Sequence, residues 1–281
     1  MIKFTKMHGI GNDFIIIDNM LEQEMPYSDM AINLCKRHFS IGADGILVVL
    51  PSDKADFQMR IFNNDGTEAR MCGNGIRCLA GYLYENRFTG SKTMTIETIG
   101  GIKTPEIISS NNNGEINVRV DMGIPCFDPE KIPIDIKEKD KFINETITAQ
   151  GRDFTISAVS MGNPHCVIFI EKVTRDMVLQ WGPVLEKHPL FLHRTNVEFA
   201  SIQDPTKVEI KVWERGAGET LACGTGACAV TAAGSALGLL EKKVEAVLPG
   251  GSLYIEIDNS GKIFMTGPAV KVFKGEVDFD F

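Results

Sequence analysis

Two cysteines in this chain each precede a Gly-x-Gly turn, a context that suits proton transfer. The first is Cys72 in Met-Cys-Gly-Asn-Gly-Ile, and the second is Cys223 in Ala-Cys-Gly-Thr-Gly-Ala. Each motif continues into a pattern that predicts a helix. Unpaired backbone N–H groups and the helix dipole stabilise a thiolate at a helix start. A free thiol titrates near ~8.5, so a modest downward shift of its pKa makes it a base at neutral pH.

Two such thiols could invert a carbon centre. Inversion requires a base on one face and an acid on the other, and one thiolate with one thiol meets this need in both directions. The glycines let the backbone approach a bound anion. Two helix starts converging on one carboxylate would hold it and would stabilise the charge that forms when its α-proton leaves. We therefore expect Cys72 and Cys223 to face each other across one small substrate.

Other uses of the cysteines are less favoured or stay open. A disulfide between Cys72 and Cys223 would be an oxidised, inactive form. The cysteines lack the ligand spacing of a zinc site, and the Gly-rich runs lack the Lys-Ser/Thr of a phosphate-binding loop, so we expect no metal. The remaining cysteines are interpreted as small buried hydrophobic residues. These are Cys35, Cys78, Cys126, Cys166 and Cys228.

The two motifs belong to an internal repeat with an offset of 151 residues, which carries position 72 to position 223. The residues that coincide at this offset include Gly73 with Gly224, Gly75 with Gly226, Asn12 with Asn163, and Glu68 with Glu219. At the same offset Asn63 falls on Glu214. The spacing is too long for a solenoid and indicates a duplicated, domain-sized unit. A cleft between the two copies would be lined by both.

Strands and helices that would position the motifs can be read from the apolar patterns. Strands are predicted at 14–17, 46–50, 57–62, 154–159, 166–170, 196–199 and 208–213, with paired strands over 93–121 and short strands over 252–273. Helices are predicted at 28–38 with Ser28 near the N-cap, after Cys72, around 174–186, and after Cys223. Residues 126–150 are polar and Pro-spaced, and we interpret them as the connection into the second half. The pattern predicts a mixed α/β fold with domains at 1–122 and 123–269.

Composition restricts the class of protein. The chain has 281 residues, is 43% hydrophobic and 23% charged, and carries a formal net charge of -8. That acidity argues against a nucleic-acid or anionic-membrane partner, because both require a basic patch. No apolar run approaches the length of a membrane span, and the N-terminal segment lacks the apolar region of a signal peptide. The seven cysteines form no CxxC pair, which favours a reduced, cytoplasmic protein.

Four motifs together resemble diaminopimelate epimerase. They are Lys-Met-His-Gly-Ile-Gly-Asn-Asp-Phe at 6–14, Met-Cys-Gly-Asn-Gly-Ile-Arg-Cys at 71–78, Met-Gly-Asn-Pro-His at 161–165, and Glu-Arg-Gly-Ala-Gly-Glu-Thr-Leu-Ala-Cys-Gly-Thr-Gly at 214–226. The resemblance runs the length of the chain. It implies a cofactor-independent isomerase that interconverts LL- and meso-diaminopimelate in lysine and peptidoglycan synthesis. It also implies a homodimer.

The resemblance further implies the architecture. Each of two similar domains would be a barrel-like sheet around a central helix, with the active site in the cleft between them. The final strand, near 270–281, would join the first domain.

The resemblance assigns roles to matching positions. Cys72 and Cys223 would be the acid/base pair, and His165 and Glu214 would help to set the protonation of the thiols. Residues at substrate-contacting positions are Asn12, Asn63, Asn163, Asn196, Glu214 and Arg215. The guanidinium of Arg215 can clamp a distal carboxylate in a bidentate pair. Backbone N–H groups that would hold the reacting carboxylate belong to Gly73, Asn74, Gly224 and Thr225.

One position departs from the family, and two rival functions stay open. Some members carry Gln where this chain has Gly45, so a side-chain contact is lost there. A proline or hydroxyproline racemase could use the same two thiols, although its substrate has no second amino-acid centre to occupy Arg215 and the Asn residues. A non-catalytic amino-acid-binding or redox-sensing protein would bind ligand without exchanging a proton at carbon.

Overall fold

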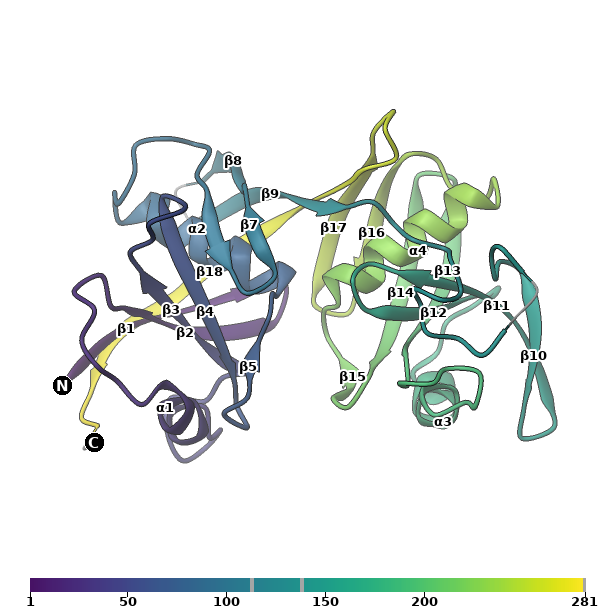
Figure 1. Ribbon diagram of the computed structural model, residues 1–281, viewed down its shortest axis with the longest axis horizontal. Coiled ribbons are helices and arrows are strands. Elements are labelled where there is room, and N and C mark those ends of the chain that lie inside the picture. Colours follow the sequence, from purple (N-terminus) through teal and green to yellow (C-terminus); the bar gives the residue numbers. More distant parts are fainter. Residues whose placement is uncertain (112–113, 137–138, 280–281) are drawn as a thin grey trace. The chain divides into compact units, whose positions relative to one another are not determined.

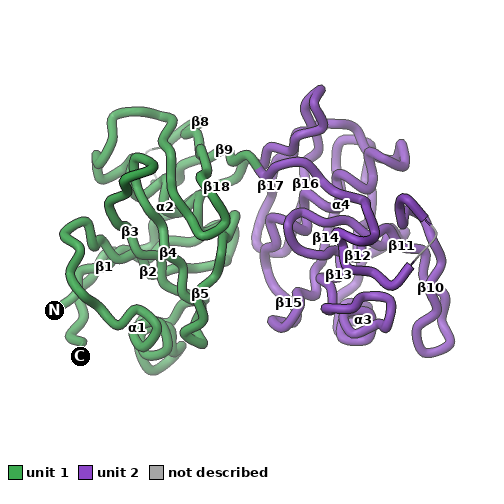
Figure 2. The backbone as a smooth tube through the Cα atoms, in the orientation of Figure 1, with its two compact units in different colours: residues 1–121, 266–281 green, residues 122–265 purple. Residues whose placement is uncertain are grey.

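The computed structural model describes residues 1–111, 114–136 and 139–279. The chain forms two compact units (Figure 2), with residues 1–121 and 266–281 in unit 1 and residues 122–265 in unit 2. The last strand, β18 (Ile263–Val277), pairs antiparallel with β1 (Ile2–Gly9), where Ile2 lies opposite Val277. This pairing returns the end of the chain to unit 1. The domain limits read from the sequence, residues 1–122 and 123–269, stay a prediction.

Unit 1 is a curved sheet that follows the order β7-β6-β4-β3-β2-β1-β18-β9-β8 (Figure 1). Its other strands are β2 (Asn12–Asp18), β3 (Gly45–Leu50), β4 (Phe57–Asn63), β5 (Glu68–Ala69), β6 (Ile96–Thr98), β7 (Gly101–Lys103), β8 (Glu106–Ser110) and β9 (Glu115–Gly123). The run 14–17 is buried at every residue, as expected for a strand covered on both faces. β2 and β3 pair in parallel, and α1 (Tyr27–Leu34) forms the connection between them.

The central element of unit 1 is α2 (Gly73–Glu85), and every residue from Gly73 to Leu83 is buried. It contacts β1, β2, β3, β4 and β8. A helix without a polar face is stable only where apolar surface surrounds it, and here the curved sheet supplies that surface. The expected barrel-like sheet around a central helix is therefore found in unit 1.

Unit 2 repeats this design with the order β17-β16-β14-β13-β12-β11-β10 around α4 (Gly224–Ala236). Its strands are β10 (Glu145–Ala149), β11 (Arg152–Ser160), β12 (Pro164–Phe169), β13 (Asn196–Asp204), β14 (Lys207–Glu214), β15 (Gly218–Thr220), β16 (Lys243–Leu248) and β17 (Gly251–Ile257). Helix α3 (Arg175–Glu186) begins after Thr174, whose side chain caps it at the N–H of Met177.

The repeat extends to the register of the strands. In unit 1, Phe14 lies opposite Gly45 across the parallel pair β2–β3, and in unit 2 His165 lies opposite Asn196 across β12–β13. Both pairs of positions differ by the 151-residue offset found in the sequence. Because strand register decides which face each side chain occupies, equivalent residues in the two units point to equivalent places.

Two sequence-based predictions require correction. The segment 126–150 is more than a connection, because it contributes β10 and places Ile132, Phe142 and Ile147 in a hydrophobic core. Its apolar residues are interspersed with prolines and charged residues, and their burial comes from packing with residues distant in sequence, such as Trp181 and Phe199. The first helix is shorter than predicted and begins after Pro26, without a side-chain cap. Ser28 instead donates from Oγ to the carbonyl of Gly66, 2.9 Å away.

Candidate functional site

Cys72 and Cys223 are the N-cap residues of α2 and α4, as their Gly-x-Gly context predicts. Cys72 has φ -139° and ψ 123°, and its Sγ accepts a hydrogen bond from the N–H of Gly75 at 3.4 Å. Cys223 has φ -124° and ψ 101°, and its Sγ accepts from the N–H of Gly226 at 3.3 Å. A side-chain acceptor at an N-cap satisfies one of the unpaired donors of the first turn. Both sulfur atoms therefore lie at the positive end of a helix.

In unit 1, the amide of Asn12 connects the thiol to its surroundings. Its Oδ1 accepts from Asn74 Nδ2 at 3.0 Å and lies 3.7 Å from Cys72 Sγ. Its Nδ2 donates to Asp44 Oδ2 at 2.7 Å. Because an ionised carboxylate can only accept, Asp44 fixes the amide so that its oxygen faces the thiol. Sequence reasoning did not identify Asp44.

A cluster of charges holds Asp44 in place. Arg37 bridges Asp13 and Asp44 at 2.6 and 2.8 Å, and Lys6 Nζ lies 2.7 Å from Asp13 Oδ2. Burial acts to raise the pKa of Asp13, but the hydrogen bonds from Arg37 and Lys6 outweigh it, so this pKa lies below its ordinary value. The loop that carries Asn12 is thus anchored by an ionised carboxylate.

In unit 2, the thiol lies among acidic groups. Cys223 is buried, with 4% of its surface exposed, and its Sγ lies 3.6 Å from Thr225 Oγ1. Burial raises the pKa of the Cys223 thiol well above its ordinary value, and the nearby carboxylates of Glu214 and Glu198 raise it further. The downward shift expected for a helix-start cysteine is therefore wrong for Cys223 in the free protein. Loss of water and two negative charges outweigh the donors of the helix start.

Glu214 ends β14 and is partly buried. Thr220 donates from Oγ1 to Glu214 Oε1 at 2.6 Å. Burial raises the pKa of Glu214, and the hydrogen bond from Thr220 opposes that shift. At the repeat-equivalent position, Asn63 ends β4 and donates from Nδ2 to Thr67 Oγ1 at 3.0 Å. The strand ends match while the side chains differ in charge.

His165 lies on β12 and forms a buried pair with Glu198 of β13. Both side chains have no exposed surface, and His165 Nδ1 lies 2.7 Å from Glu198 Oε1. His165 Nε2 lies 3.0 Å from Asn163 Oδ1. Sequence reasoning missed Glu198. The available signal was a carboxylate between Val197 and Phe199, at a position whose repeat mate is Leu47.

The remaining predicted residues of unit 2 gather at the ends of the same strands. Asn196 donates from Nδ2 to the carbonyl of Pro164 at 2.9 Å, and its Oδ1 accepts from the N–H of Arg215 at 2.9 Å. The exposed side chain of Arg215 donates to the carbonyl of His193 at 3.2 Å. Asn196 thus holds the backbone of Arg215, whose guanidinium reaches the surface.

The predicted residues divide between the two units, and in unit 1 hydrogen bonds connect Asn12 with Cys72 and Asn74, while Asn63 bonds to Thr67. The group in unit 1 consists of Asn12, Asn63, Cys72, Gly73 and Asn74, and the group in unit 2 consists of Asn163, His165, Asn196, Glu214, Arg215, Cys223, Gly224 and Thr225. In both groups the first turn of a helix presents backbone N–H groups beside a thiol, an arrangement that can bind an anion and move a proton.

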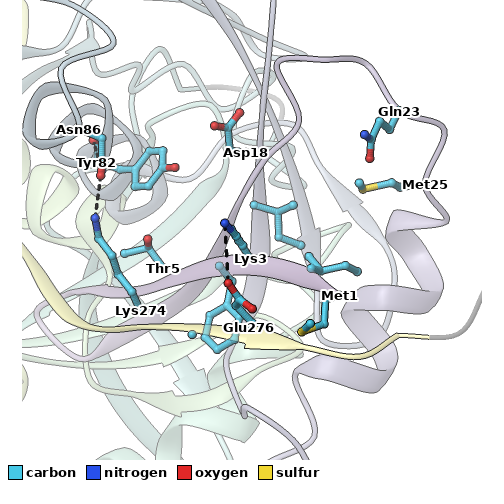
Figure 3. Close-up of a pocket in the computed structure, with 14 residues that line it drawn as sticks. Met1, Lys3, Thr5, Asp18, Gln23, Met25, Tyr82, Asn86, Lys274 and Glu276 are labelled. Atoms are coloured by element: carbon cyan, nitrogen blue, oxygen red, sulfur yellow. Dashed lines mark hydrogen bonds and ion pairs between the residues drawn. The ribbon is translucent and has the colours of Figure 1, made fainter.

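A cavity of about 720 Å³ in unit 1 lies elsewhere and includes none of the predicted residues. It is lined by β1, β18 and Tyr82 and Asn86 at the end of α2 (Figure 3). Lys274 donates to Asn86 across it at 2.8 Å. A helix of 13 residues rises about 20 Å, so this cavity and Cys72 lie at opposite ends of α2.

Two surveys of the described residues complete the geometry. Within 1–111, 114–136 and 139–279, no group of three or more His, Cys, Asp or Glu residues is arranged to hold a metal ion. In the same part of the chain, no helix is long and apolar enough to cross a membrane. The seven cysteines all lie among the described residues, and none of them forms a disulfide there.

Comparison with known proteins gives concordant matches. The family model described as diaminopimelate epimerase matches residues 4–127 and 157–272. A diaminopimelate epimerase of Carboxydothermus hydrogenoformans is 50% identical over 278 residues, which cover 98% of this chain and 99% of that relative. One from Methanococcus maripaludis is 47% identical over 278 residues, covering 99% and 100%.

Among solved structures, a probable proline racemase from Agrobacterium radiobacter with bound carbonate superposes with a TM-score of 0.70. It is 14% identical and the match covers 100% of this chain and 94% of that one. At this identity the likeness shows the fold alone, which is a duplicated α/β fold.

Proposed function

Because the chain belongs to the diaminopimelate epimerase family, we propose that it interconverts LL- and meso-2,6-diaminopimelate by moving a proton at one α-carbon between Cys72 and Cys223. The observation that carries the proposal is the duplicated cap. Two cysteines hold the same N-cap geometry on equivalent helices, and each accepts from the N–H three residues ahead. The mechanism requires both thiols to reach the same carbon.

In the proposed reaction, one sulfur removes the α-proton as a thiolate and the other delivers a proton to the opposite face as a thiol. The first-turn N–H groups of α2 and α4, including those of Gly73, Asn74, Gly224 and Thr225, bind the α-carboxylate. They also stabilise the negative charge that spreads onto this carboxylate when the α-proton leaves. No other group is needed to balance the step, because the proton lost to one sulfur is replaced from the other.

The raised pKa of Cys223 affects whether this residue acts first as proton donor or as proton acceptor. In the free protein Cys223 is a thiol, because burial and the carboxylates of Glu214 and Glu198 disfavour the anion. It is therefore ready to donate a proton. In the opposite direction it must first become a thiolate, which the ammonium group of a bound substrate and the donors of α4 favour.

The far end of the substrate would be held by Arg215 and the asparagine side chains. Arg215 is exposed, and Asn196 fixes its backbone, so its guanidinium can form a bidentate pair with the distal carboxylate. We include in the proposal a cytoplasmic location and a homodimer, as the family resemblance implies. Light scattering of the purified chain tests the dimer directly.

The test of the function is entry of solvent deuterium at the α-carbon under reducing conditions. We expect each epimer of diaminopimelate to acquire deuterium as the other epimer forms. Proline and hydroxyproline, assayed alongside, should remain unlabelled. Labelling of proline instead would identify the alternative racemase, and binding of diaminopimelate without labelling would identify a non-catalytic binding protein.

A further inference from the structure

A chain of hydrogen-bonding groups connects a buried carboxylate to the thiol of Cys223. Glu198 Oε1 lies 2.7 Å from His165 Nδ1, and His165 Nε2 lies 3.0 Å from Asn163 Oδ1. Asn163 Nδ2 donates to Thr225 Oγ1 at 3.4 Å, and Thr225 Oγ1 lies 3.6 Å from Cys223 Sγ. The five side chains come from three different elements and the loop before β12.

The direction of each donor follows from the type of atom. Asn163 Oδ1 can only accept, so His165 must carry a hydrogen on Nε2. Thr225 Oγ1 accepts from Asn163, which leaves the hydroxyl hydrogen of Thr225 free to point at Cys223. All donors from His165 onward are therefore directed toward the sulfur, the polarity that suits a thiolate.

The other ring nitrogen of His165 faces Glu198. With a hydrogen already on Nε2, the contact at Nδ1 requires one more proton, shared between the ring and the carboxylate. An imidazolium that donates from both nitrogens, to Asn163 Oδ1 and to the carboxylate of Glu198, satisfies both contacts.

Glu198 also lies next to the start of a helix. Glu198 packs beneath the first turn of α4, since a methyl group added to Gly226 would lie 2.8 Å from Glu198 Oε1. The positive end of a helix favours a carboxylate there. Among the described residues, Glu198 Oε2 has no hydrogen-bond partner, and Glu198 Oε1 contacts His165. The acidic groups that face this place are Glu214 and the thiols of Cys166 and Cys223.

We propose that Glu198 is a positioning residue that keeps His165 doubly protonated, so that Asn163 and Thr225 present hydrogens, not lone pairs, toward Cys223 and the substrate carboxylate. The expected effect on catalysis rests on the proposed function, whereas the hydrogen-bond geometry does not. A neutral His165 beside an ionised Glu198 would carry its hydrogen on Nδ1. Asn163 would then turn its NH₂ to the ring and its oxygen to Thr225, which reverses every donor up to the sulfur.

The experiment is NMR of the intact protein labelled with ¹⁵N in its five histidines. A His165→Asn variant identifies the signals of His165. At pH 7 we expect both ring nitrogens of His165 to show the shifts of an imidazolium. In Glu198→Gln, which keeps the shape of the side chain, we expect a neutral ring. Glu186→Gln is the matched control, because Glu186 is another buried carboxylate of unit 2 and is not part of this series of hydrogen bonds.

Kinetics supply the second readout. Glu198→Gln should lower kcat for diaminopimelate roughly 10-fold, as expected for loss of a supporting hydrogen-bond partner at an active site. Thr225→Val should also lower kcat but leave His165 an imidazolium, since it cuts the chain beyond the ring. A neutral His165 in the unmodified protein, or an unchanged imidazolium in Glu198→Gln, overturns the proposal. An imidazolium in a protein that fails to epimerise diaminopimelate would contradict the proposed function and leave the assignment of Glu198 intact.

Discussion

The two thiols cap equivalent helices with equivalent hydrogen bonds, yet the side chains behind them are opposite in character. A methyl group added to Gly75 beside Cys72 would meet Leu47 and Phe14, which are apolar. One added to Gly226 beside Cys223 would meet the carboxylate of Glu198 instead. Duplication preserved the backbone that points both thiols from a helix start. Divergence at two strand positions made one surrounding apolar and the other acidic.

The polar partner of each thiol differs in the same way. Cys72 faces the oxygen of Asn12, which Asp44 holds in a fixed orientation. Cys223 lies 3.6 Å from the hydroxyl of Thr225, which in turn accepts a hydrogen bond from Asn163. The partner of Cys72 is thus an amide oxygen, and the partner of Cys223 is a hydroxyl. We infer that the symmetric part of the site handles the proton while the asymmetric part sets the resting state of each sulfur.

The largest expected effect comes from removing either thiol. Cys72→Ala and Cys223→Ala should each lower the rate of inversion by roughly 10³-fold or more, because each removes the acid or base for one face of the carbon. Optical rotation measures this, because it falls as the LL form is converted and appears as the optically inactive meso form is converted. Cys78→Ala serves as the control, since Cys78 is buried within α2. Full turnover by either single variant would contradict the two-thiol mechanism.

The next effect contrasts the two glycines. Gly226→Ala places a methyl group 2.8 Å from Glu198 Oε1, which is held by His165, and should reduce the free energy of unfolding by about 1–3 kcal/mol. In Gly75→Ala the nearest atom is Leu47 Cδ2 at 3.2 Å, which can yield, and alanine favours the helix. We expect its cost to stay below about 1 kcal/mol. Urea unfolding of both variants checks the difference, and equal costs would remove the contrast between the two surroundings.

Sequence reasoning located the repeat and the two thiol caps because both depend on local spacing. The offset of 151 residues reappears in the strand register, so the halves could be aligned before the fold was known. Sequence reasoning did not locate Glu198 or Asp44. Their roles depend on pairing between β12 and β13 and on the approach of residue 44 to Asn12, which no local pattern encodes. The raised pKa of Cys223 was missed for the same reason, since burial depends on the tertiary structure.

A smaller effect concerns the orientation of Asn12. In Asp44→Asn the side chain can present either an amide oxygen or an NH₂ to Asn12, so it no longer fixes this amide, and it also loses the ion pair with Arg37. The amide can then turn its NH₂ to Cys72, and we expect kcat to fall several-fold, up to roughly 10-fold. Asp56→Asn is the control, because Asp56 likewise accepts from a backbone N–H but at Thr95, on the surface. A normal rate in Asp44→Asn would show that this fixed orientation is not used.

The smallest effect is on the reactivity of Cys223 in the free protein. Burial and Glu214 raise the pKa of this thiol, so at pH 7 to 8 little thiolate is present and alkylation by iodoacetamide should be slow. Glu214→Gln removes one negative charge, lowers the pKa of Cys223, and should speed alkylation a few-fold. Mass spectrometry of the peptide that contains Cys223 measures the rate. A slower reaction in Glu214→Gln would contradict the assigned sign.

The central claim is that two thiols exchange one proton through the α-carbon, and deuterium entry tests it most directly. LL- and meso-diaminopimelate are incubated separately in deuterium oxide with the reduced protein, and the first product is collected. The account predicts deuterium at the inverted α-carbon of every product molecule, in both directions, and none in Cys72→Ala or Cys223→Ala. Inversion without solvent deuterium, or equal labelling in a single-thiol variant, would contradict it.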